Sequence, residues 1–584
     1  MTRPARHLPT LFLLLVVFLL GAFVRFYKLD ERGLDGSDNV YYTRIAKAWS
    51  EGDRIFRVAG EVVAYRPVAF YLYAAGIKMF GFNDASIKLV NATADSINIV
   101  LVFTICLLLA KKDPWPAAAA SLIYACSPIA IAMARIELTH TISTLMVLLA
   151  MLFFMFHYAA SGVWHRRLHL ALAGVFTGWA VLSHEELILT APGYALFLLA
   201  AFLRSNRSRA DAESLAVSLS IFSGAVLLTC RNAIPVLMHY SLVRLAPTPS
   251  DAPAYVPVLS DVERTARLLW NAVIVYGSVP FLVAFIPLLG IIATSGIMAL
   301  LSPTRPRFPA LFYLPVLVLI CYMAGFAKFI SLFFPRLFLP LFPLLVVTIV
   351  IWSDRLLLRS NAPAVVRRGS VAAFALIALV FNLGNYGHSP AYRHRHFADS
   401  WVSALQPLRA SPAAGYRRLT RHFRSSWARR IYERLEGKVD KESRLLVASS
   451  ILFPFPARHI LQVGYYFGDN AVYLIDHTKP LDELISRYSI KYVLLTARMV
   501  REEWIGRKTY TRYVYGGKWV FDEPLELGAS CGLKPEEYTL RKEWECLTAY
   551  LEKRGAKLLF GRSKRSKSAE QPENWKPGDL IYEL

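Results

Sequence analysis

Charged residues are scarce in this chain of 584 residues: they make up 18%, whereas a soluble globular protein carries about a quarter. Hydrophobic residues reach 55%, and the mean hydropathy is +0.38. This shortage of charge excludes an ordinary soluble fold for most of the chain. Long apolar runs end near residue 385. We therefore expect a membrane part over residues 1–385 and a water-exposed tail over residues 386–584, long enough for one domain.

Cysteine is also scarce, with six residues in the whole chain. Four lie in apolar runs, where a thiol is usually a small packing residue: Cys106, Cys126, Cys230 and Cys321. The other two, Cys531 and Cys546, lie in the tail and form either a disulfide or two free thiols; the sequence leaves both open. No Cys-x-x-Cys or Cys/His spacing typical of zinc is present.

Acidic residues are few beside basic ones, 42 against 66, so the formal net charge is +24. In a soluble protein this balance would indicate nucleic acid, but most of the basic residues here lie in short clusters beside apolar runs, and we expect no nucleic-acid partner. If the runs alternate across the membrane, these clusters share one side, which the positive-inside rule makes cytoplasmic. The clusters are Arg3/Arg6, Lys111/Lys112, Arg166/Arg167, Arg204/Arg207/Arg209, Arg305/Arg307 and Arg355/Arg359/Arg367/Arg368.

The apolar runs predict about eleven transmembrane helices. They lie near 8–24, 89–110, 116–134, 139–160, 168–183, 187–203, 215–238, 269–300, 308–327, 332–352 and 371–385. With the N-terminus in the cytoplasm, an odd number of spans puts the tail on the opposite side, in the periplasm or outside the cell. The expected protein is a multi-pass protein of the cytoplasmic (inner) membrane. In the tail, short apolar stretches near 444–449, 471–475 and 492–496 read as strands, with a helix at 481–488. The expected class is an α-helical polytopic membrane protein with a C-terminal extramembrane α/β domain.

A long loop over residues 25–88 separates the first two predicted spans, and loops of this length usually carry function. Asp35-Gly36 indicates a turn, and Ser37 or Asp38 caps a short amphipathic helix. After Arg66-Pro67, the apolar stretch 68–80 is too short to cross a membrane, as expected for a helix that lies in the interface and contacts membrane lipids.

Two groups in this loop carry candidate chemistry. A carboxylate of Asp35 or Asp38 can deprotonate an acceptor hydroxyl or bind a divalent metal such as Mg²⁺ or Mn²⁺. The alternative is an ordinary helix-capping role. The guanidinium of Arg66 can hold a lipid phosphate with two hydrogen bonds, or it simply extends to the lipid headgroups.

Further ionisable residues occur at span ends, where charge is costly unless it is paired or hydrated. Arg135, Glu137 and His140 lie within one short segment, and the spacing of Glu137 and His140 suggests a shared helical face or an ordinary ion-paired helix start. His184 and Glu185, flanked by apolar sequence, suit metal binding, sugar orientation or a hydrated turn. Arg336 adds positive charge suited to a phosphate. In the alternating topology these groups all face the outer side.

In order and spacing, five segments resemble the GT-C superfamily, the multispan glycosyltransferases that use polyprenyl-phosphate sugars, including protein O-mannosyltransferases and lipid A aminoarabinose transferases. The segments are Gly33-Leu-Asp-Gly-Ser-Asp-Asn-Val-Tyr-Tyr; Arg66-Pro-Val-Ala-Phe-Tyr-Leu-Tyr with Phe80-Gly-Phe-Asn; Ala134-Arg-Ile-Glu-Leu-Thr-His; Gly174-Val-Phe-Thr-Gly-Trp-Ala-Val-Leu-Ser-His-Glu; and Pro335-Arg-Leu-Phe-Leu-Pro-Leu-Phe-Pro. The resemblance covers the membrane part and implies a GT-C-like fold.

The resemblance implies that Asp38 is the catalytic base or positions the acceptor, and that Arg66 engages the lipid phosphate. Asn39 stands where the family usually has a second acid, and His140 stands where many members have an acid, which leaves Glu137 as the substitute. The implied donor is a polyprenyl-phosphate sugar and the acceptor is unknown. Two other classes stay open, a transporter or flippase for a lipid-linked sugar and a non-catalytic scaffold.

Overall fold

A computed structural model describes the chain over residues 8–34, 37–52, 57–58, 61–62, 66–110, 112–203, 208–231, 311, 313–329, 339–359, 363–366, 368–370, 372–373, 375–376, 380, 412–420, 423, 426–448, 466–467, 471–473, 481–495, 511–514, 517–520, 540–560 and 580–584. The chain divides into two compact units. The first comprises 1–31, 49–52 and 64–424, and the second comprises 32–48, 53–63 and 425–584. Each unit is described below by itself.

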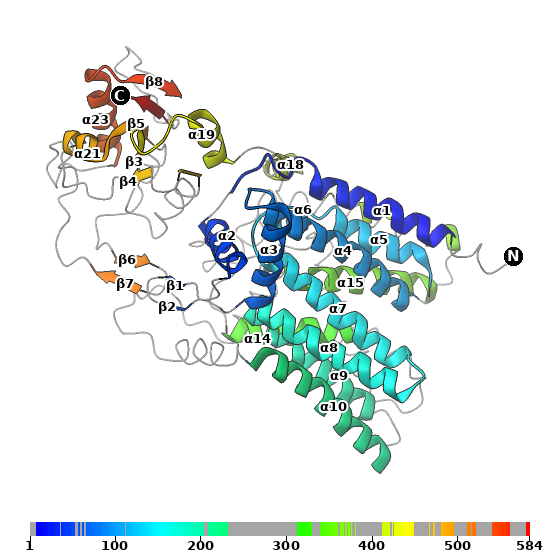
Figure 1. Ribbon diagram of the computed structural model, residues 1–584. Coiled ribbons are helices and arrows are strands. Elements are labelled where there is room, and N and C mark those ends of the chain that lie inside the picture. Colours follow the sequence, from blue (N-terminus) through cyan, green and yellow to red (C-terminus); the bar gives the residue numbers. More distant parts are fainter. Residues whose placement is uncertain are drawn as a thin grey trace. The chain divides into compact units, whose positions relative to one another are not determined.

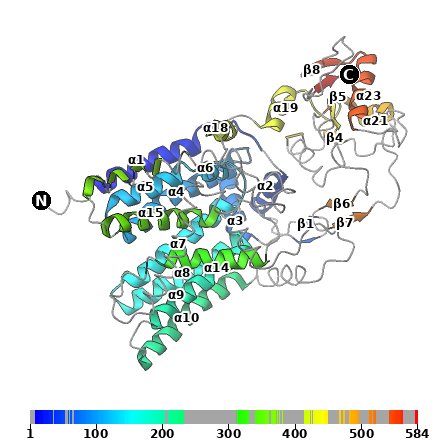
Figure 2. The same ribbon diagram turned by 180° about the vertical axis from the view of Figure 1, so that it is seen from behind.

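The first unit is a helical bundle (Figure 1). Its helices within the described residues are α1 (Leu8–Phe26), α3 (Pro67–Phe80), α4 (Ser86–Leu109), α5 (Pro114–Ala125), α6 (Pro128–Ala134), α7 (His140–Ala159), α8 (Val163–Ser183), the 3-10 helix η2 (Glu185–Thr190), α9 (Ala191–Leu203), α10 (Arg209–Cys230), α14 (Leu314–Phe329), α15 (Phe342–Arg359) and α18 (Pro412–Thr420). Helices α4, α5 and α7 pack together, and α8 packs between α7 and α10. Figure 2 shows the same bundle from behind.

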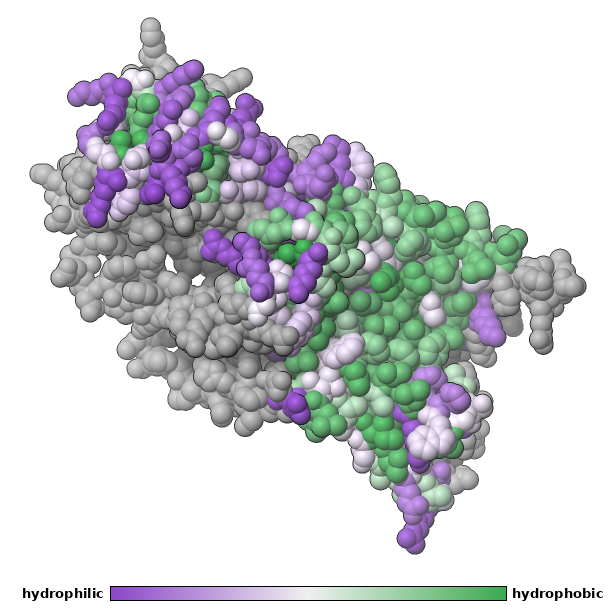
Figure 3. All heavy atoms as spheres, in the orientation of Figure 1, coloured by the Kyte–Doolittle hydropathy of each residue, from purple (hydrophilic) through white to green (hydrophobic). Residues whose placement is uncertain are grey.

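The bundle surface is apolar along its helices, as a bilayer requires. Along α1 the exposed side chains are almost all large and apolar, and Figure 3 shows hydrophobic residues spread over this face. Five helices in the described residues are long and apolar enough to cross a membrane, or six if α5 and α6 form one span. This confirms a membrane protein with several spans. The predicted run 269–300 lies outside the described residues, and the total of about eleven stays a prediction.

The predicted span over 116–134 is broken rather than continuous. Helix α5 ends at Ala125, α6 begins at Pro128, and the two axes are bent by 60°. Pro128 cannot donate a hydrogen bond, and the residue before a proline disfavours helical angles. Ser127 accordingly has an extended backbone, with φ −64° and ψ 120°.

Glycines let the helices of the bundle approach closely. A Cβ at Gly178 of α8 would lie 2.6 Å from Thr229 of α10, and one at Gly193 of α9 would lie 2.6 Å from the backbone of Val318 in α14. Small residues at such contacts are typical of helix packing in membranes. Helices α10 and α14 are therefore each packed tightly against a neighbouring helix.

The second unit contains a five-stranded mixed sheet in the order β4-β3-β5-β9-β8. The strands are β3 (Arg444–Ala448), β4 (Ala471–Tyr473), β5 (Ile490–Leu495), β8 (Lys557–Phe560) and β9 (Leu580–Glu583). Strands β4, β3 and β5 are parallel, whereas β9 is antiparallel to both β5 and β8. Strands β3, β4 and β5 and helix α21 (Leu481–Tyr488) form where the sequence predicted them.

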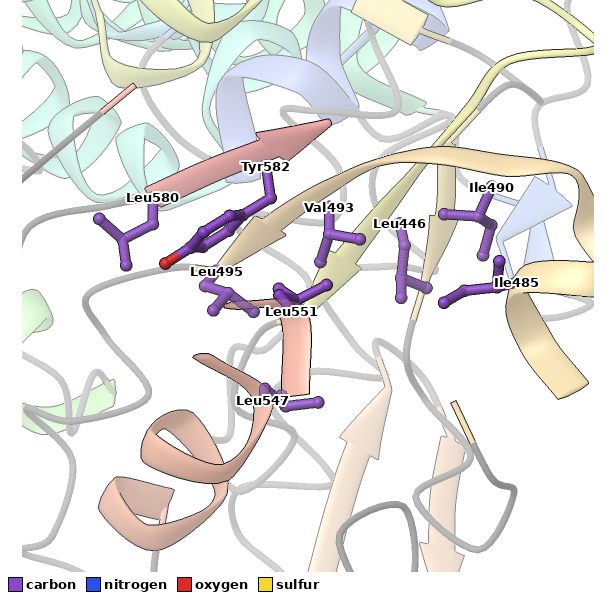
Figure 4. Close-up of a cluster of buried hydrophobic side chains, with 9 residues drawn as sticks. All are labelled: Leu446, Ile485, Ile490, Val493, Leu495, Leu547, Leu551, Leu580 and Tyr582. Carbon is purple, nitrogen blue, oxygen red and sulfur yellow. The ribbon is translucent and has the colours of Figure 1, made fainter. Parts of the chain in front are cut away.

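Two apolar clusters hold this sheet. In the first, drawn in Figure 4, side chains of β5 and β9 pack against α21 and α23 (Leu540–Lys553). The second includes Ile431 and Leu435 of α19 (Trp427–Leu435). Within residues 399–440, the described helices are α18 and α19. The described residues of this unit also form two hairpins: β1 (Arg57–Val58) with β2 (Glu61–Val62), and β6 (Thr511–Val514) with β7 (Gly517–Val520).

The first-loop segment before Asp35 packs within the second unit, against α19. The backbone N–H of Ser426 donates to the Arg32 carbonyl at 2.5 Å, and the Leu34 N–H donates to the Tyr466 hydroxyl at 3.1 Å. Gly33 between them has φ +68°, a backbone conformation that favours glycine. The segment leads to α2 (Ser37–Ser50), the short helix predicted from the sequence.

Candidate functional site

Buried ionisable residues gather at one end of the bundle, where α1, α6 and α8 end and α3, α4 and α7 begin. We call this the polar end. Figure 1 shows α3 beside α6 at this end, away from the N-terminus. Because burying an unpaired charge costs several kcal/mol, the partners of each charged group decide what the site can do.

Arg66 lies directly before α3, with Pro67 as the first helical residue. Its Nε and Nη2 donate to the two carboxylate oxygens of Glu185 at 3.2 and 3.3 Å, and its Nη1 donates to the Thr139 hydroxyl at 3.3 Å. The guanidinium is therefore fixed by two segments far from it in sequence. Such a planar, oriented group suits a phosphate or carboxylate ligand.

A second ion pair joins Lys88 of α4 to Glu137, with Nζ and Oε1 3.3 Å apart and both side chains buried. Helix α7 begins at His140, and residues 135–139 form the connection that precedes it. Of the two alternatives for Glu137 and His140, the shared helical face is excluded, because Glu137 precedes the helix. Lys88 instead supplies the partner of the Glu137 carboxylate.

His184 ends α8 and precedes η2. Its Nδ1 contacts a carboxylate oxygen of Glu186. The centroids of the His184 and His140 rings are 4.9 Å apart, and the angle between the two ring planes is 49°. Glu185 and Glu186 are consecutive, yet they face different cations, Arg66 and His184. The structure thus brings four predicted site residues, Arg66, His140, His184 and Glu185, into one neighbourhood.

Arg135 has a different environment from that predicted for a substrate-binding residue. Its guanidinium donates to the backbone carbonyls of Val24, Arg25 and Lys28 at 3.2, 2.9 and 3.1 Å. It also lies over the ring of Phe423, with Cζ 4.3 Å from the centroid. The carbonyls at a helix C-terminus lack partners within the helix, so Arg135 caps α1.

A deeper polar cluster was missed by the sequence reasoning. Nε of Arg25 donates to Asp95 at 2.6 Å, its Nη1 donates to the carbonyls of Gly21 and Ala125 at 2.9 Å, and the Tyr124 hydroxyl donates to the same carboxylate. Asn98 joins them through Asp95 at 3.2 Å. The signal in the sequence was Asp95 itself, an acid inside the predicted span 89–110.

The structure does not describe the side chains of three predicted site residues. Asp35 and Arg336 lie outside the described residues, and for Asp38 the structure describes the backbone, in the first turn of α2. Among the residues that the structure describes, no three His, Cys, Asp or Glu side chains gather as metal ligands do. Binding of Mg²⁺ or Mn²⁺ stays a prediction that depends on Asp35 and Asp38.

The fold and the polar end define a class: a membrane protein of several spans whose ionisable groups are buried at one end of the bundle. The family model of the dolichyl-phosphate-mannose-protein mannosyltransferases matches residues 65–227. That range includes Arg66, the 135–140 segment and His184. The match confirms the resemblance to the GT-C superfamily stated above. A comparison with curated proteins found no match.

Three solved structures are similar to this chain at low sequence identity. ArnT from Cupriavidus metallidurans bound to undecaprenyl phosphate is 16% identical, with 79% of this chain and 85% of that chain covered and a TM-score of 0.46. The oligosaccharyltransferase of Archaeoglobus fulgidus in its apo form is 12% identical, with 84% and 70% covered and a TM-score of 0.44. The S. cerevisiae Pmt1-Pmt2 complex bound to the sugar donor is 14% identical, with 40% and 34% covered and a TM-score of 0.33.

Proposed function

We propose that this protein is a glycosyltransferase that moves a sugar from a polyprenyl-phosphate donor to an acceptor at the outer face of the cytoplasmic membrane. The observation that carries the proposal is Arg66: a buried guanidinium held in one orientation by Glu185 and Thr139, within the segment that matches the mannosyltransferase family. The family's name specifies a sugar linked to dolichyl phosphate, and a phosphate of that kind is the ligand that an oriented guanidinium suits.

In the proposed reaction, the bond between the anomeric carbon and the phosphate oxygen breaks, and the lipid phosphate leaves with the electron pair. Arg66 stabilises the charge that develops on this phosphate, a form of preorganised electrostatic catalysis. The acceptor hydroxyl or amine attacks the anomeric carbon and gives its proton to Asp38. Glu137 forms an ion pair with Lys88. We propose that this pair determines the local charge next to the bound sugar.

The proposed orientation is supported by the basic residues at the opposite end of the bundle. Arg166, Arg167 and Arg209 are exposed there, and Arg368 lies over the ring of Trp115, with its Cζ 5.6 Å from the centroid. An excess of exposed Lys and Arg marks the cytoplasmic side of a membrane protein. In this orientation the polar end faces outward, and the C-terminal α/β unit lies outside the cytoplasm.

The test is release of polyprenyl phosphate from a panel of polyprenyl-phosphate sugars in proteoliposomes that contain the full chain and an acceptor extract. We expect turnover by the wild type, a loss of at least ~100-fold in Asp38→Asn because a general base typically contributes 10²–10⁴-fold, and a similar loss in Arg66→Gln. The control is Arg209→Gln, an exposed arginine at the other end of the bundle, which should keep full turnover.

Two other results would change the assignment. Movement of lipid-linked sugar across the bilayer without release of the phosphate would identify a flippase. Binding of the donor without turnover, by wild type and both variants alike, would identify a scaffold. Undiminished turnover in Asp38→Asn would remove that carboxylate from the reaction and leave the transferase intact.

A further inference from the structure

Residues 135–139, the connection between α6 and α7, carry two groups that bind charged side chains of the polar end. The Thr139 hydroxyl accepts a hydrogen bond from Arg66, and the Glu137 carboxylate pairs with Lys88. The middle of the connection is buried and belongs to neither helix, so its backbone carbonyls lack the partners that a helix supplies. The groups that bind these carbonyls therefore decide where Thr139 and Glu137 lie.

Two side chains from other helices bind the carbonyls of the connection. Nδ2 of Asn91, in α4, donates to the carbonyls of Ile136 and Leu138 at 2.6 and 3.1 Å. The Tyr73 hydroxyl, in α3, donates to the Leu138 carbonyl at 2.7 Å and lies 3.0 Å from Oδ1 of Asn91. Tyr73 and Asn91 are both 0% exposed. A fully buried network of this kind restrains the backbone, because each hydrogen bond is costly to leave unmade.

Helix α3 thus contacts the connection at two points. Arg66 lies directly before its first turn, and Tyr73 follows about two helical turns later, on the same face of the helix. Tyr73 holds the carbonyl of Leu138, and the next residue is Thr139, whose hydroxyl accepts from Nη1 of Arg66 at 3.3 Å. A shift of the Leu138 backbone would therefore move the Thr139 hydroxyl and change the orientation of the guanidinium.

We propose that Tyr73 and Asn91 are positioning residues for the transfer reaction. By fixing the carbonyls of the connection they fix the Thr139 hydroxyl, and through it the orientation of Arg66. This inference rests on the proposed function, in which Arg66 stabilises the charge that develops on the leaving phosphate. An interaction that strengthens in the transition state changes kcat, whereas its loss leaves KM nearly unchanged.

A role in stability alone has a different signature. It would reduce the amount of folded protein and leave kcat per folded molecule at the wild-type value. The comparison therefore needs a matched loss of a buried tyrosine hydroxyl elsewhere in the bundle. Tyr194 of α9 provides it: this side chain is 1% exposed, and among the described residues its hydroxyl has no hydrogen-bond partner.

The experiment measures kcat and KM for the polyprenyl-phosphate sugar that the wild type turns over, in proteoliposomes that contain the full chain and the acceptor extract. Gel filtration before reconstitution gives the amount of folded protein for each variant. Tyr73→Phe and Asn91→Ala each remove hydrogen bonds to the connection, and Tyr194→Phe is the control. Thr139→Val, Thr139→Ser and the double variant of Tyr73→Phe with Thr139→Val test the route to Arg66.

We expect Tyr73→Phe and Asn91→Ala each to lower kcat per folded molecule by about tenfold, less than the ~100-fold that a misplacement of 1 Å can cost. KM should stay within about twofold of the wild type. Tyr194→Phe and Thr139→Ser should keep kcat near the wild-type value. Thr139→Val should lower kcat, and adding Tyr73→Phe to it should cost less than about twofold more, because residues that act by one route are not additive.

Three results would overturn the inference and leave the proposed function standing. Wild-type kcat per folded molecule in both Tyr73→Phe and Asn91→Ala would assign them to stability alone. A rise in KM with unchanged kcat would remove them from the positioning of Arg66. Losses that multiply in the double variant would show that Tyr73 does not act through Thr139. No turnover by the wild type would instead count against the proposed function, and the inference would fall with it.

Discussion

The pair of Arg25 and Asp95 is fully buried, and it ties three helices together. Arg25 belongs to α1 and Asp95 to α4, and the same guanidinium donates to the carbonyl of Ala125 at the end of α5. A buried ion pair is costly to form, but removing one partner costs more, because the remaining charge loses its compensation. The pair thus fixes how α1 leaves the membrane and enters the first loop.

We expect Asp95→Leu to destabilise the protein by about 3–5 kcal/mol, the usual cost of leaving a buried charge alone. The double variant Arg25→Met with Asp95→Leu should recover much of this loss, because two apolar side chains of similar size replace the pair. The free energy of unfolding, measured by titration with sodium dodecyl sulfate in mixed micelles, checks both. Equal losses in the single and double variants would show that hydrogen bonding to carbonyls, not charge, dominates at this position.

Several ionisable residues of the polar end stood out in the sequence, but their partners could not be predicted. His184 and Glu185 stood out because ionisable groups inside apolar sequence are costly, and Arg66 stood out because it opens a helix in a long loop. Their pairing joins residues 119 positions apart, Arg66 and Glu185, and no local pattern encodes such a contact. Lys88 was not predicted as an ion-pair partner, because it lies at the start of a span, where a lysine normally extends to water.

At the scale of elements, the first loop is shaped by the unit that contains the C-terminal tail. Gly33 has φ +68°, and a Cβ there would lie 2.5 Å from both the Arg429 Cβ and the Tyr466 hydroxyl. Gly52, near the end of the same loop's helix, has φ +94° and nothing within 4 Å of its Cβ position. A side chain at either glycine would strain the backbone, because both have positive φ. Only at Gly33 would the added Cβ also collide with neighbouring atoms.

We expect Gly33→Ala to loosen the contact between residues 32–34 and α19, because the added methyl group cannot fit. Gly52→Ala is the matched control, since it carries only the left-handed backbone cost of about 1–2 kcal/mol. Hydrogen exchange of the full chain checks this: amide protection at Leu34 and Ser426 should fall in Gly33→Ala and stay near the wild-type level in Gly52→Ala. Equal amide protection in the two variants would show that residues 32–34 accommodate the added methyl group without loss of stability.

Helices and strands were predictable where periodicity or apolar length was strong. Span predictions 8–24, 89–110 and 139–160 correspond to α1, α4 and α7 within a few residues. The break between α5 and α6 was missed although Ser127-Pro128 is visible in the sequence, because a long apolar run outweighed one proline. The order β4-β3-β5-β9-β8 could not be predicted, because it depends on strand pairing between distant segments.

At the scale of the whole molecule, the two ends of the bundle differ in how they carry positive charge. At the polar end, Arg25, Arg66, Lys88 and Arg135 are buried and held by carboxylates or carbonyls. At the other end, Arg166, Arg167 and Arg209 are exposed. Exposed cations bind anionic lipid headgroups and keep their segment of the chain on the cytoplasmic side. Buried cations that are paired with an anion or a carbonyl do not have this effect.

This asymmetry predicts the orientation of the protein, which single cysteines can report. In a background with the six native cysteines replaced, we place a cysteine at Phe82, exposed at the polar end, or at Ser161, exposed between α7 and α8 at the other end. A membrane-impermeant maleimide added to spheroplasts of a bacterial host should label Phe82→Cys at once. Ser161→Cys should react only after the membrane is permeabilised, because the basic end faces the cytoplasm.

The opposite pattern of labelling would place Arg66 and His184 on the cytoplasmic side. A transfer reaction would then have to draw its acceptor from the cytoplasm, and the proposed location of the C-terminal unit outside the cytoplasm would be wrong as well. Labelling of both positions from outside would place α3 and the α7–α8 connection on the same side of the membrane. That result would contradict the alternating directions of α4, α5 and α7. The expected result, in contrast, would place the buried cations on the outer side of the membrane, as the proposed transfer reaction requires.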